Sequence, residues 1–187
     1  MDHIYNQPQF EVSYFTYPKF YSRIVSKFPS GSKFVEIGSW KGKSSAYMVV
    51  EIINSGKNIE FTCVDTWEGS IEHQDFPELK DLYKIFKSNM NPLEKHYTDI
   101  KMSSLEAVKF FPDKSLDFVF IDASHEYNDV KNDILAWKPK VKIGGILSGH
   151  DYWTDEHSWL DVRKAVNEIL KDIEITNEGC WIHEITS

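Results

Sequence analysis

The sequence predicts an α/β fold, a parallel sheet with helices on both faces. Short apolar, β-rich runs alternate along the chain with amphipathic helical stretches, and this alternation is typical of parallel strands joined by crossover helices. Polar residues directly follow four of the apolar runs, at Gly38, Asp65, Asp122 and the pair His150 and Asp151. Because ligands bind beyond the carboxyl ends of the strands in such sheets, these positions predict one shared site.

Glycine, proline and asparagine separate the expected elements, and the period of the apolar residues decides their type. Pro18 starts the first helix, Ser124 caps the fifth, and Gly144 and Gly145 turn the chain into a short strand. The expected strands cover residues 33–37, 59–64, 100–102, 116–121, 146–148, 173–176 and 181–185. The later helices cover residues 44–53, 79–86, 103–110, 124–137 and 162–170, and a loop covers 152–159.

Composition and charge exclude several classes of protein. The 187 residues, 41% of them hydrophobic, suffice for one domain with a core. The formal charge of −8 disfavours an extended nucleic-acid surface, which normally needs a basic face. No apolar run approaches the roughly 20 residues of a membrane span, and the first residues lack the pattern of a signal peptide. Cys63 lies within an apolar run, where a buried free thiol is expected, and this cysteine usage fits the reducing cytoplasm.

We expect a single domain over residues 1–187, since no repeat or linker interrupts the pattern. Residues 1–30 form an N-terminal arm followed by a helix. Residues 68–97 are long for a connection, and we expect them to hold a cap over the site.

The stretch from Phe34 to Ser45 has the pattern of a strand, a tight glycine turn and a helix. Gly38 and Gly42 suit a backbone that takes positive φ or passes close to a ligand. The start of the following helix, near Ser44, leaves N–H groups that suit an anion such as a carboxylate. Ordinary strand-to-helix turns share this glycine spacing, so the hypothesis of a cofactor site depends on the later motifs as well.

Further polar residues near the strand ends have plausible binding roles. Asp65 ends the second strand, where an acid can accept both hydroxyls of a ribose. Glu36 can brace the glycine turn from within the first strand. Ser104 either faces an adenine or caps its helix, and Trp67 either stacks on a ring or packs in the core.

Asp122, His150 and Asp151 supply two carboxylates and an imidazole at adjacent strand ends. Mg²⁺ prefers oxygen ligands, and imidazole suits Mn²⁺, Fe²⁺ or Zn²⁺, so these three residues are candidate metal ligands. The alternative is a polar wall of a wet cleft. His125 follows Asp122 at a helix start, where a histidine beside a carboxylate can act as general base at neutral pH. Its alternative role is a helix cap or an exposed side chain.

These residues together resemble class I S-adenosylmethionine-dependent methyltransferases of methyltransferase family 24. The resemblance covers about residues 30–185 and is carried by four segments: residues 35–45, 64–69, 120–127 and 144–152. It implies a seven-stranded, mostly parallel sheet in the order 3-2-1-4-5-7-6, with an antiparallel last strand. It also implies S-adenosyl-L-methionine as cofactor, with the methionine part at the glycine turn, the ribose at Asp65 and the adenine near Ser104. The implied cofactor-binding residues are Glu36, Gly38, Ser39, Gly42, Ser44, Asp65, Thr66, Trp67, Ser104 and Asp122.

The layout is also similar to that of metal-dependent catechol-type O-methyltransferases. Asp122 matches the acid of those enzymes, His125 takes the place of their catalytic lysine, and His150 and Asp151 replace an Asp-Asn metal pair. The resemblance therefore implies His125 and Asp122 as catalytic residues and Mg²⁺ or Mn²⁺ at Asp122, His150 and Asp151. Ser103 stands where many relatives carry an acid for the adenine amino group.

The resemblance implies O-methylation of a small hydroxylated acceptor, such as a sugar or another polyol. Two other classes stay open: a nucleotide-binding oxidoreductase and a non-catalytic module that only binds the cofactor. Against the first, the turn Gly38, Ser39 and Trp40 lacks the second glycine that lets a pyrophosphate approach. A homodimer is left open, and no membrane partner is expected.

Overall fold

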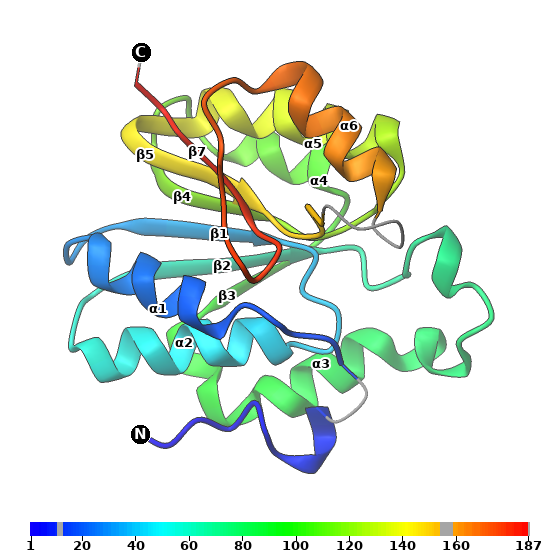
Figure 1. Ribbon diagram of the computed structural model, residues 1–187. Coiled ribbons are helices and arrows are strands. Elements are labelled where there is room, and N and C mark those ends of the chain that lie inside the picture. Colours follow the sequence, from blue (N-terminus) through cyan, green and yellow to red (C-terminus); the bar gives the residue numbers. More distant parts are fainter. Residues whose placement is uncertain (11–12, 154–158, 187) are drawn as a thin grey trace.

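The computed structural model describes residues 1–10, 13–153 and 159–186 (Figure 1). In these ranges seven strands form one sheet in the order β3-β2-β1-β4-β5-β7-β6. Strands β1 to β5 pair in parallel, and β7 is antiparallel to both β5 and β6. The strands are β1 Lys33–Ile37, β2 Glu60–Asp65, β3 Thr98–Lys101, β4 Leu116–Ile121, β5 Val141–Gly149, β6 Glu174–Ile175 and β7 Trp181–Glu184. The predicted fold class and strand order are confirmed.

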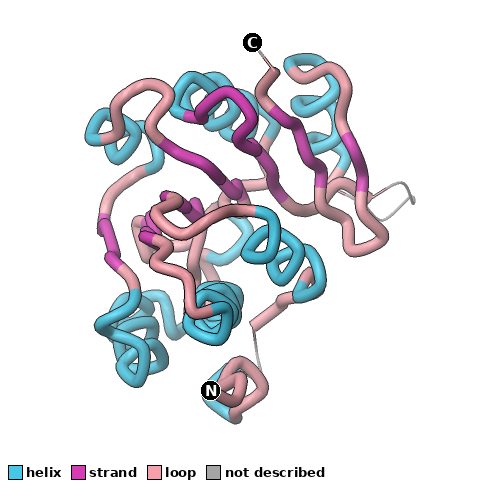
Figure 2. The backbone as a smooth tube through the Cα atoms, turned by 90° about the vertical axis from the view of Figure 1, so that its left-hand side faces the viewer, coloured by secondary structure: helices cyan, strands magenta, loops and turns pink. Residues whose placement is uncertain are grey.

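The helices lie on both faces of the sheet (Figure 2). Figure 1 shows α1, α2 and α3 on one side and α4, α5 and α6 on the other. The α-helices are α1 Pro18–Lys27, α2 Lys43–Ser55, α3 Leu82–Met90, α4 Ser104–Ala107, α5 Tyr127–Trp137 and α6 Leu160–Ile169. Short 3₁₀ helices are η1 Pro8–Phe10, η2 Ile71–His73, η3 Pro77–Asp81, η4 Asn91–His96, η5 Val108–Phe110 and η6 Lys138–Lys140. No helix in the described ranges is long and apolar enough to cross a membrane.

The central strands β1 and β4 are mostly apolar, as expected for strands with both faces buried. Phe34 and Phe118 belong to the core beneath α1, α2 and α3. Val35 and Val119, their neighbours in the chain, belong to the core beneath α4, α5 and α6. Successive side chains of a strand point to opposite faces, so a continuous apolar run fills both cores.

Several predicted boundaries are wrong. Gly144 and Gly145, expected as a turn before a strand at 146–148, lie inside β5, which begins at Val141. The pairing register between β4 and β5 shifts at this point, so the glycines mark an irregularity within a strand. The third strand begins at Thr98 rather than at residue 100. In the expected loop 152–159, residues 154–158 lie outside the described ranges.

The helix that was expected to be capped by Ser124 begins later, at Tyr127. The N-cap position is Glu126, and the Ser124 hydroxyl accepts a hydrogen bond from the Glu126 N–H over 3.2 Å. Ser124 also donates to Asp129 over 2.7 Å. Ser124 therefore shapes the turn before α5 instead of capping the helix itself.

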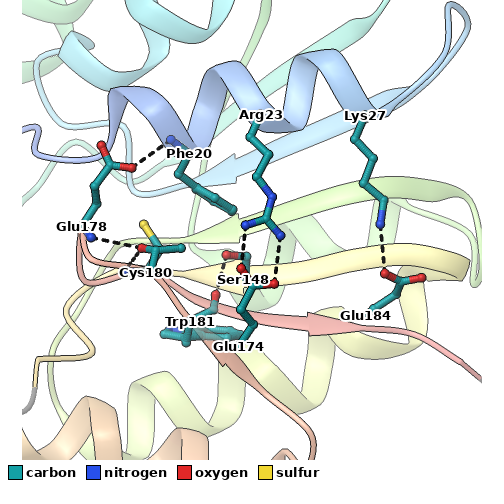
Figure 3. A network of polar contacts seen from close by, with 10 residues as sticks. Phe20, Arg23, Lys27, Ser148, Glu174, Glu178, Cys180, Trp181 and Glu184 are labelled. Carbon is teal, nitrogen blue, oxygen red and sulfur yellow. Dashed lines mark hydrogen bonds and ion pairs between the residues drawn. The ribbon is translucent and has the colours of Figure 1, made fainter.

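Polar contacts attach α1 to the antiparallel edge of the sheet (Figure 3). Arg23 donates to both carboxylate oxygens of Glu174 over 2.5 and 2.8 Å, and Lys27 pairs with Glu184 over 2.9 Å. Nearer the start of the helix, the Phe20 N–H donates to Glu178 over 2.9 Å. These contacts hold the beginning of α1, and Tyr17 just before it, beside the carboxyl ends of the central strands.

The N-terminal arm packs mainly against α2. Ile4 and Phe10 are buried in the core on that side, and the ring of His3 stacks on Tyr47 at 4.2 Å between centroids. The end of the arm approaches the strand ends, where the Thr16 hydroxyl lies 3.0 Å from His150 Nε2.

Candidate active site

A cavity of about 430 Å³ opens at the carboxyl ends of β1, β2 and β4. This volume falls within the roughly 300–1,000 Å³ of small-molecule pockets. Five residues of the implied cofactor-binding set lie on its wall: Gly38, Asp65, Thr66, Ser104 and Asp122. The cavity is therefore where the strand-end rule places a ligand.

The glycine turn is needed because two strand ends touch. Gly38 has φ +86°, and a Cβ there would lie 2.1 Å from the carbonyl oxygen of Asp122. Gly42 has φ +87°, and a Cβ there would lie 2.8 Å from Cγ of Met90. A larger residue at either position would meet both strain and collision, and the positive φ predicted for this turn is confirmed.

Asp65 shapes the glycine turn as well as lining the cavity. Its Oδ2 accepts the backbone N–H groups of Ser39 and Trp40, both over 2.8 Å, and Oδ1 accepts that of Trp67 over 2.7 Å. Burial raises the pKa of this carboxyl, and the three amides act in the opposite direction. The turn and the second strand are thus joined by the side chain expected to meet a ribose.

Glu36 is fully buried behind the turn, outside the cavity. Its carboxylate accepts hydrogen bonds from the hydroxyls of Tyr21 and Ser39, each over 2.8 Å, and from that of Ser45. Burial raises the pKa of Glu36, and the hydroxyls oppose the rise. Glu36 connects β1, the turn, α1 and α2, so any effect of this carboxylate on a ligand is indirect.

Other residues of the implied cofactor set also lie behind the cavity wall. These are Ser39, Gly42, Ser44 and Trp67, all of which are buried. Trp67 is 2% exposed, packs against Phe86 and Tyr83, and donates from Nε1 to the Trp40 carbonyl over 2.9 Å. Of its two expected roles, the structure therefore favours packing in the core.

The two serines before α4 divide their roles. Ser103 is the N-cap and forms a capping box with Glu106. Ser104 lies on the cavity wall, and its hydroxyl accepts a hydrogen bond from Nε1 of Trp137 over 2.7 Å. The cap therefore falls on Ser103, and both serines lie on the cavity wall.

Two carboxylates and two imidazoles gather at the end of β4 and β5. His125 Nε2 lies 2.9 Å from Asp151 Oδ2. His150 Nδ1 lies 3.3 Å from the same oxygen and 3.8 Å from Asp122 Oδ1. Asp122 also lines the large cavity, so the cluster adjoins the proposed cofactor space.

The converging metal donors differ from the predicted set. Asp122, His125 and Asp151 each offer one atom, and these atoms lie within 4.8 Å of one another. His150, predicted as a ligand, is outside this set: its Nε2 lies 3.1 Å from the Glu178 carbonyl, and its Nδ1 faces Asp151 and Asp122. Two carboxylates and an imidazole suit Mn²⁺, Fe²⁺ or Zn²⁺ better than Mg²⁺, which prefers oxygen ligands.

The electrostatics of the cluster follow from burial and from its own charges. Burial raises the pKa of Asp122 to about 6, while His150 and the Tyr17 hydroxyl oppose the rise. For Asp151, hydrogen bonds from His125 and His150 outweigh burial and lower the pKa. Burial lowers the pKa of His150, but the two carboxylates, Asp151 and Asp122, act more strongly in the opposite direction, so the pKa is raised overall. Asp151 is thus the ionised acid beside both imidazoles.

Tyr17 and Trp159 belong to this site, but no local sequence signal marks them. The Tyr17 hydroxyl donates to Asp122 Oδ2 over 2.6 Å. The Trp159 ring stacks on His125, with 4.1 Å between centroids and 8° between planes. Both residues come from segments far from Asp122 and His125 in the chain, so only the fold brings them together.

Strained backbone also collects around the site. Trp40, Trp67 and Asp151 have φ of +46°, +52° and +60° without being glycine. Such conformations cost energy, are held in place by the surrounding structure, and cluster at functional sites. All three residues follow the carboxyl ends of β1, β2 and β5.

The chain is similar to proteins of one family. The family model described as "Methyltransferase domain", methyltransferase family 24, matches residues 35–152. The "Uncharacterized protein y4gI" of Sinorhizobium fredii is 27% identical over 127 residues, which are 68% of this chain and 14% of that protein. Protein R132 of Acanthamoeba polyphaga mimivirus is 26% identical over 144 residues, 75% of this chain and 60% of that protein. This chain therefore spans less than two thirds of the length of either relative.

Among solved structures, the O-methyltransferase NovP superposes with a TM-score of 0.68 at 13% identity, covering 91% of this chain and 79% of that chain. At this identity the likeness concerns the fold. The sheet order agrees with it, and the matched family model extends from β1 past the end of β5. This chain therefore belongs to methyltransferase family 24 and has the fold of class I S-adenosylmethionine-dependent methyltransferases.

Proposed function

We propose that this protein transfers a methyl group from S-adenosyl-L-methionine to a hydroxyl of a small acceptor, such as a sugar or polyol. One observation carries the proposal: Asp122 lines the large cavity and also belongs to the carboxylate and imidazole cluster. A space for a cofactor and a set of proton-accepting groups therefore adjoin each other. The acceptor would bind on the side of the cluster.

The cavity fits the cofactor by its shape and chemistry. Gly38 leaves room at the turn, Asp65 and Thr66 offer oxygen atoms to ribose hydroxyls, and Ser104 stands beside apolar Met102. When bound, S-adenosylmethionine supplies an electrophilic methyl group on a sulfonium. The residues of this chain contribute binding and orientation, which supply a large part of the rate in such transfers.

His125 is the candidate base. Asp151 Oδ2 lies 2.9 Å from Nε2 of His125, so a carboxylate is placed to orient this ring and to stabilise its protonated form. A base oriented by an ionised carboxylate can take the proton of an acceptor hydroxyl as the oxygen attacks. The stacked Trp159, 45% exposed, presents an aromatic face next to this base, where a small acceptor can rest.

A divalent metal is the second part of the proposal, because Asp122, His125 and Asp151 converge. Bound there, a cation would lower the pKa of an acceptor hydroxyl. His125 would then act as a ligand, and its role as base would pass to another group. Activity after treatment with EDTA, followed by addition of Mn²⁺ or Mg²⁺, separates the two arrangements. Loss and recovery support the metal, and full activity in chelator supports His125 as a metal-free base.

Two competing functions make different predictions. A nucleotide-binding oxidoreductase would bind NAD, and a non-catalytic module would bind S-adenosylhomocysteine without turnover. Isothermal titration with both ligands, together with a methyl-transfer screen over sugars and polyols, distinguishes all three. Binding of S-adenosylhomocysteine but not NAD, with a methylated product, is the expected result.

A further inference from the structure

Helix α5 carries a carboxylate on its buried face. Asp133 is 6% exposed and lies on the wall of the large cavity. It shares the inward face of the helix with the buried Val130 and Trp137, three residues before it and four after it. A buried carboxylate is costly unless a partner stabilises it, so its position on a cavity wall needs an explanation.

The partners of Asp133 within the protein are few. The Ser104 hydroxyl stabilises its ionised form, while nearby Asp129 destabilises it. In the part of the chain that the structure describes, no basic side chain forms an ion pair with Asp133. The remaining capacity of this carboxylate to accept hydrogen bonds is available on the cavity side.

The surroundings of Asp133 suit a flat ring with an amino group at its edge. Met102, Leu105 and Ala123 give the cavity apolar surface, and Ser104 and Asp133 add a hydroxyl and a carboxylate. The neighbouring Ser103 also lies on the cavity wall, but its hydroxyl is neutral and donates to Glu106 over 2.6 Å, so the Asp133 carboxylate is the stronger acceptor. Adenine has apolar faces and one exocyclic amino group, which matches this combination.

We propose that Asp133 accepts a hydrogen bond from the exocyclic amino group of the cofactor's adenine and so selects adenine over a 6-oxo purine. This inference rests on the proposed function, since it presupposes an adenosyl cofactor. A 6-oxo base would place its carbonyl oxygen against the carboxylate, and two acceptors cannot pair. A site built to bind an amino group rejects the analogue that lacks it because the buried polar group is left unpaired.

The test compares S-adenosylhomocysteine with S-inosylhomocysteine by isothermal titration at neutral pH. The wild type should bind the adenosyl ligand at least tenfold more tightly. Asp133→Asn has nearly the same shape, and its amide can either accept or donate. This variant should bind S-adenosylhomocysteine about tenfold more weakly than the wild type does. Its preference for this ligand over S-inosylhomocysteine should be less than about threefold.

Asp129→Asn is the matched control. Asp129 lies one helical turn earlier on α5, also lines the cavity, is exposed, and loses the same charge. This variant should keep the wild-type preference for the adenosyl ligand. A thermal melt of each variant checks that it is folded.

Three outcomes would overturn the inference. Asp133→Asn could weaken the binding of both ligands equally, which would mean that Asp133 is only a structural partner of Ser104. Asp133→Asn could also keep the full preference for the adenosyl ligand. A wild type without preference would also overturn it, and this measurement needs no variant. If the wild type binds neither ligand, the proposed function itself fails, and this result is distinct from a loss of discrimination.

Discussion

The hydroxyl of Tyr17 donates a hydrogen bond to the carboxylate of Asp122 over 2.6 Å, across 105 positions of the chain. Tyr17 precedes α1, and Asp122 follows β4 in the middle of the sheet. Tyr17 is 2% exposed, and Asp122 is half-buried on the wall of the large cavity. The N-terminal part of the chain thereby completes the environment of the acid at the centre of the candidate site.

Replacing Tyr17 by Phe should therefore cost stability. The variant leaves a buried carboxylate with one hydrogen bond fewer, and such losses cost about 1–3 kcal/mol. Urea unfolding should show this decrease in the free energy of unfolding. Tyr14→Phe is the control, because Tyr14 is 98% exposed and should change stability by less than about 0.5 kcal/mol. Equal stability of the Tyr17→Phe variant and the wild type would mean that water takes the place of the phenol.

Gly38→Ala should be strongly destabilising for two reasons, the positive φ and a steric collision. The variant Gly31→Ala separates them, because it has only the first. Gly38 and Gly31 have nearly the same φ, +86° and +88°, but only at Gly38 would a Cβ meet another atom, the Asp122 carbonyl. Gly31→Ala should cost about 1 kcal/mol for the strained φ alone. Gly38→Ala should cost at least 1–2 kcal/mol more, roughly, because β1 and β4 must also separate. Chemical denaturation of both variants measures the difference, and equal costs would rule out a tight contact at the turn.

Much of the fold could be predicted because each central strand carries its own signal. Residues 33–37 and 116–121 are largely apolar runs followed by Gly38 and Asp122, and the structure has strands at these positions. The bounds of β5 were harder to predict, because Gly144 and Gly145 are typical of a turn. In the structure they lie within a strand that pairs with β4. Tertiary pairing overrides local preference in such cases.

The candidate site was predictable where its residues follow strands, as Gly38, Asp65 and Asp122 do. Tyr17 and Trp159 gave no signal, because their roles arise from contacts between distant segments. Asp133 did carry one: an acid at helical spacing from Val130 and Trp137 sits on an apolar face. A polar residue that interrupts an apolar stripe is a more informative mark than a charged residue on an exposed face.

Asp133 should also make stability depend on pH. Burial raises its pKa from the ordinary value of 3.8 to about 6, with Ser104 opposing the rise and Asp129 adding to it. Between these pH values the folded protein holds the proton more tightly than the unfolded chain, so this residue's contribution to stability falls as pH rises from about 4 to above 6. One pKa unit corresponds to about 1.4 kcal/mol, so the full loss is at most about 3 kcal/mol.

Asp133→Asn removes this titration. The free energy of unfolding of the variant relative to the wild type should therefore increase between pH 4.5 and 7.5, roughly the range over which the raised pKa acts. Chemical denaturation at several pH values measures this difference, and comparing the two proteins cancels the groups that they share. The Asp129→Asn variant should show a smaller change with pH, because it removes only the contribution of Asp129 to the raised pKa of Asp133. A constant difference for Asp133→Asn as well would contradict a buried, titrating carboxylate.

The most direct test of the whole account is a methyl-transfer assay read by mass spectrometry, with S-adenosylmethionine and a panel of sugars and polyols. We predict that the wild type forms S-adenosylhomocysteine and a singly methylated acceptor in equal amounts. His125→Ala should reduce turnover by roughly 10²–10⁴-fold while keeping its affinity for S-adenosylhomocysteine, as expected for the loss of a general base or of a metal ligand. The contradicting result is a folded wild type that binds S-adenosylhomocysteine yet methylates no hydroxylated acceptor, since the chain would then be a cofactor-binding module.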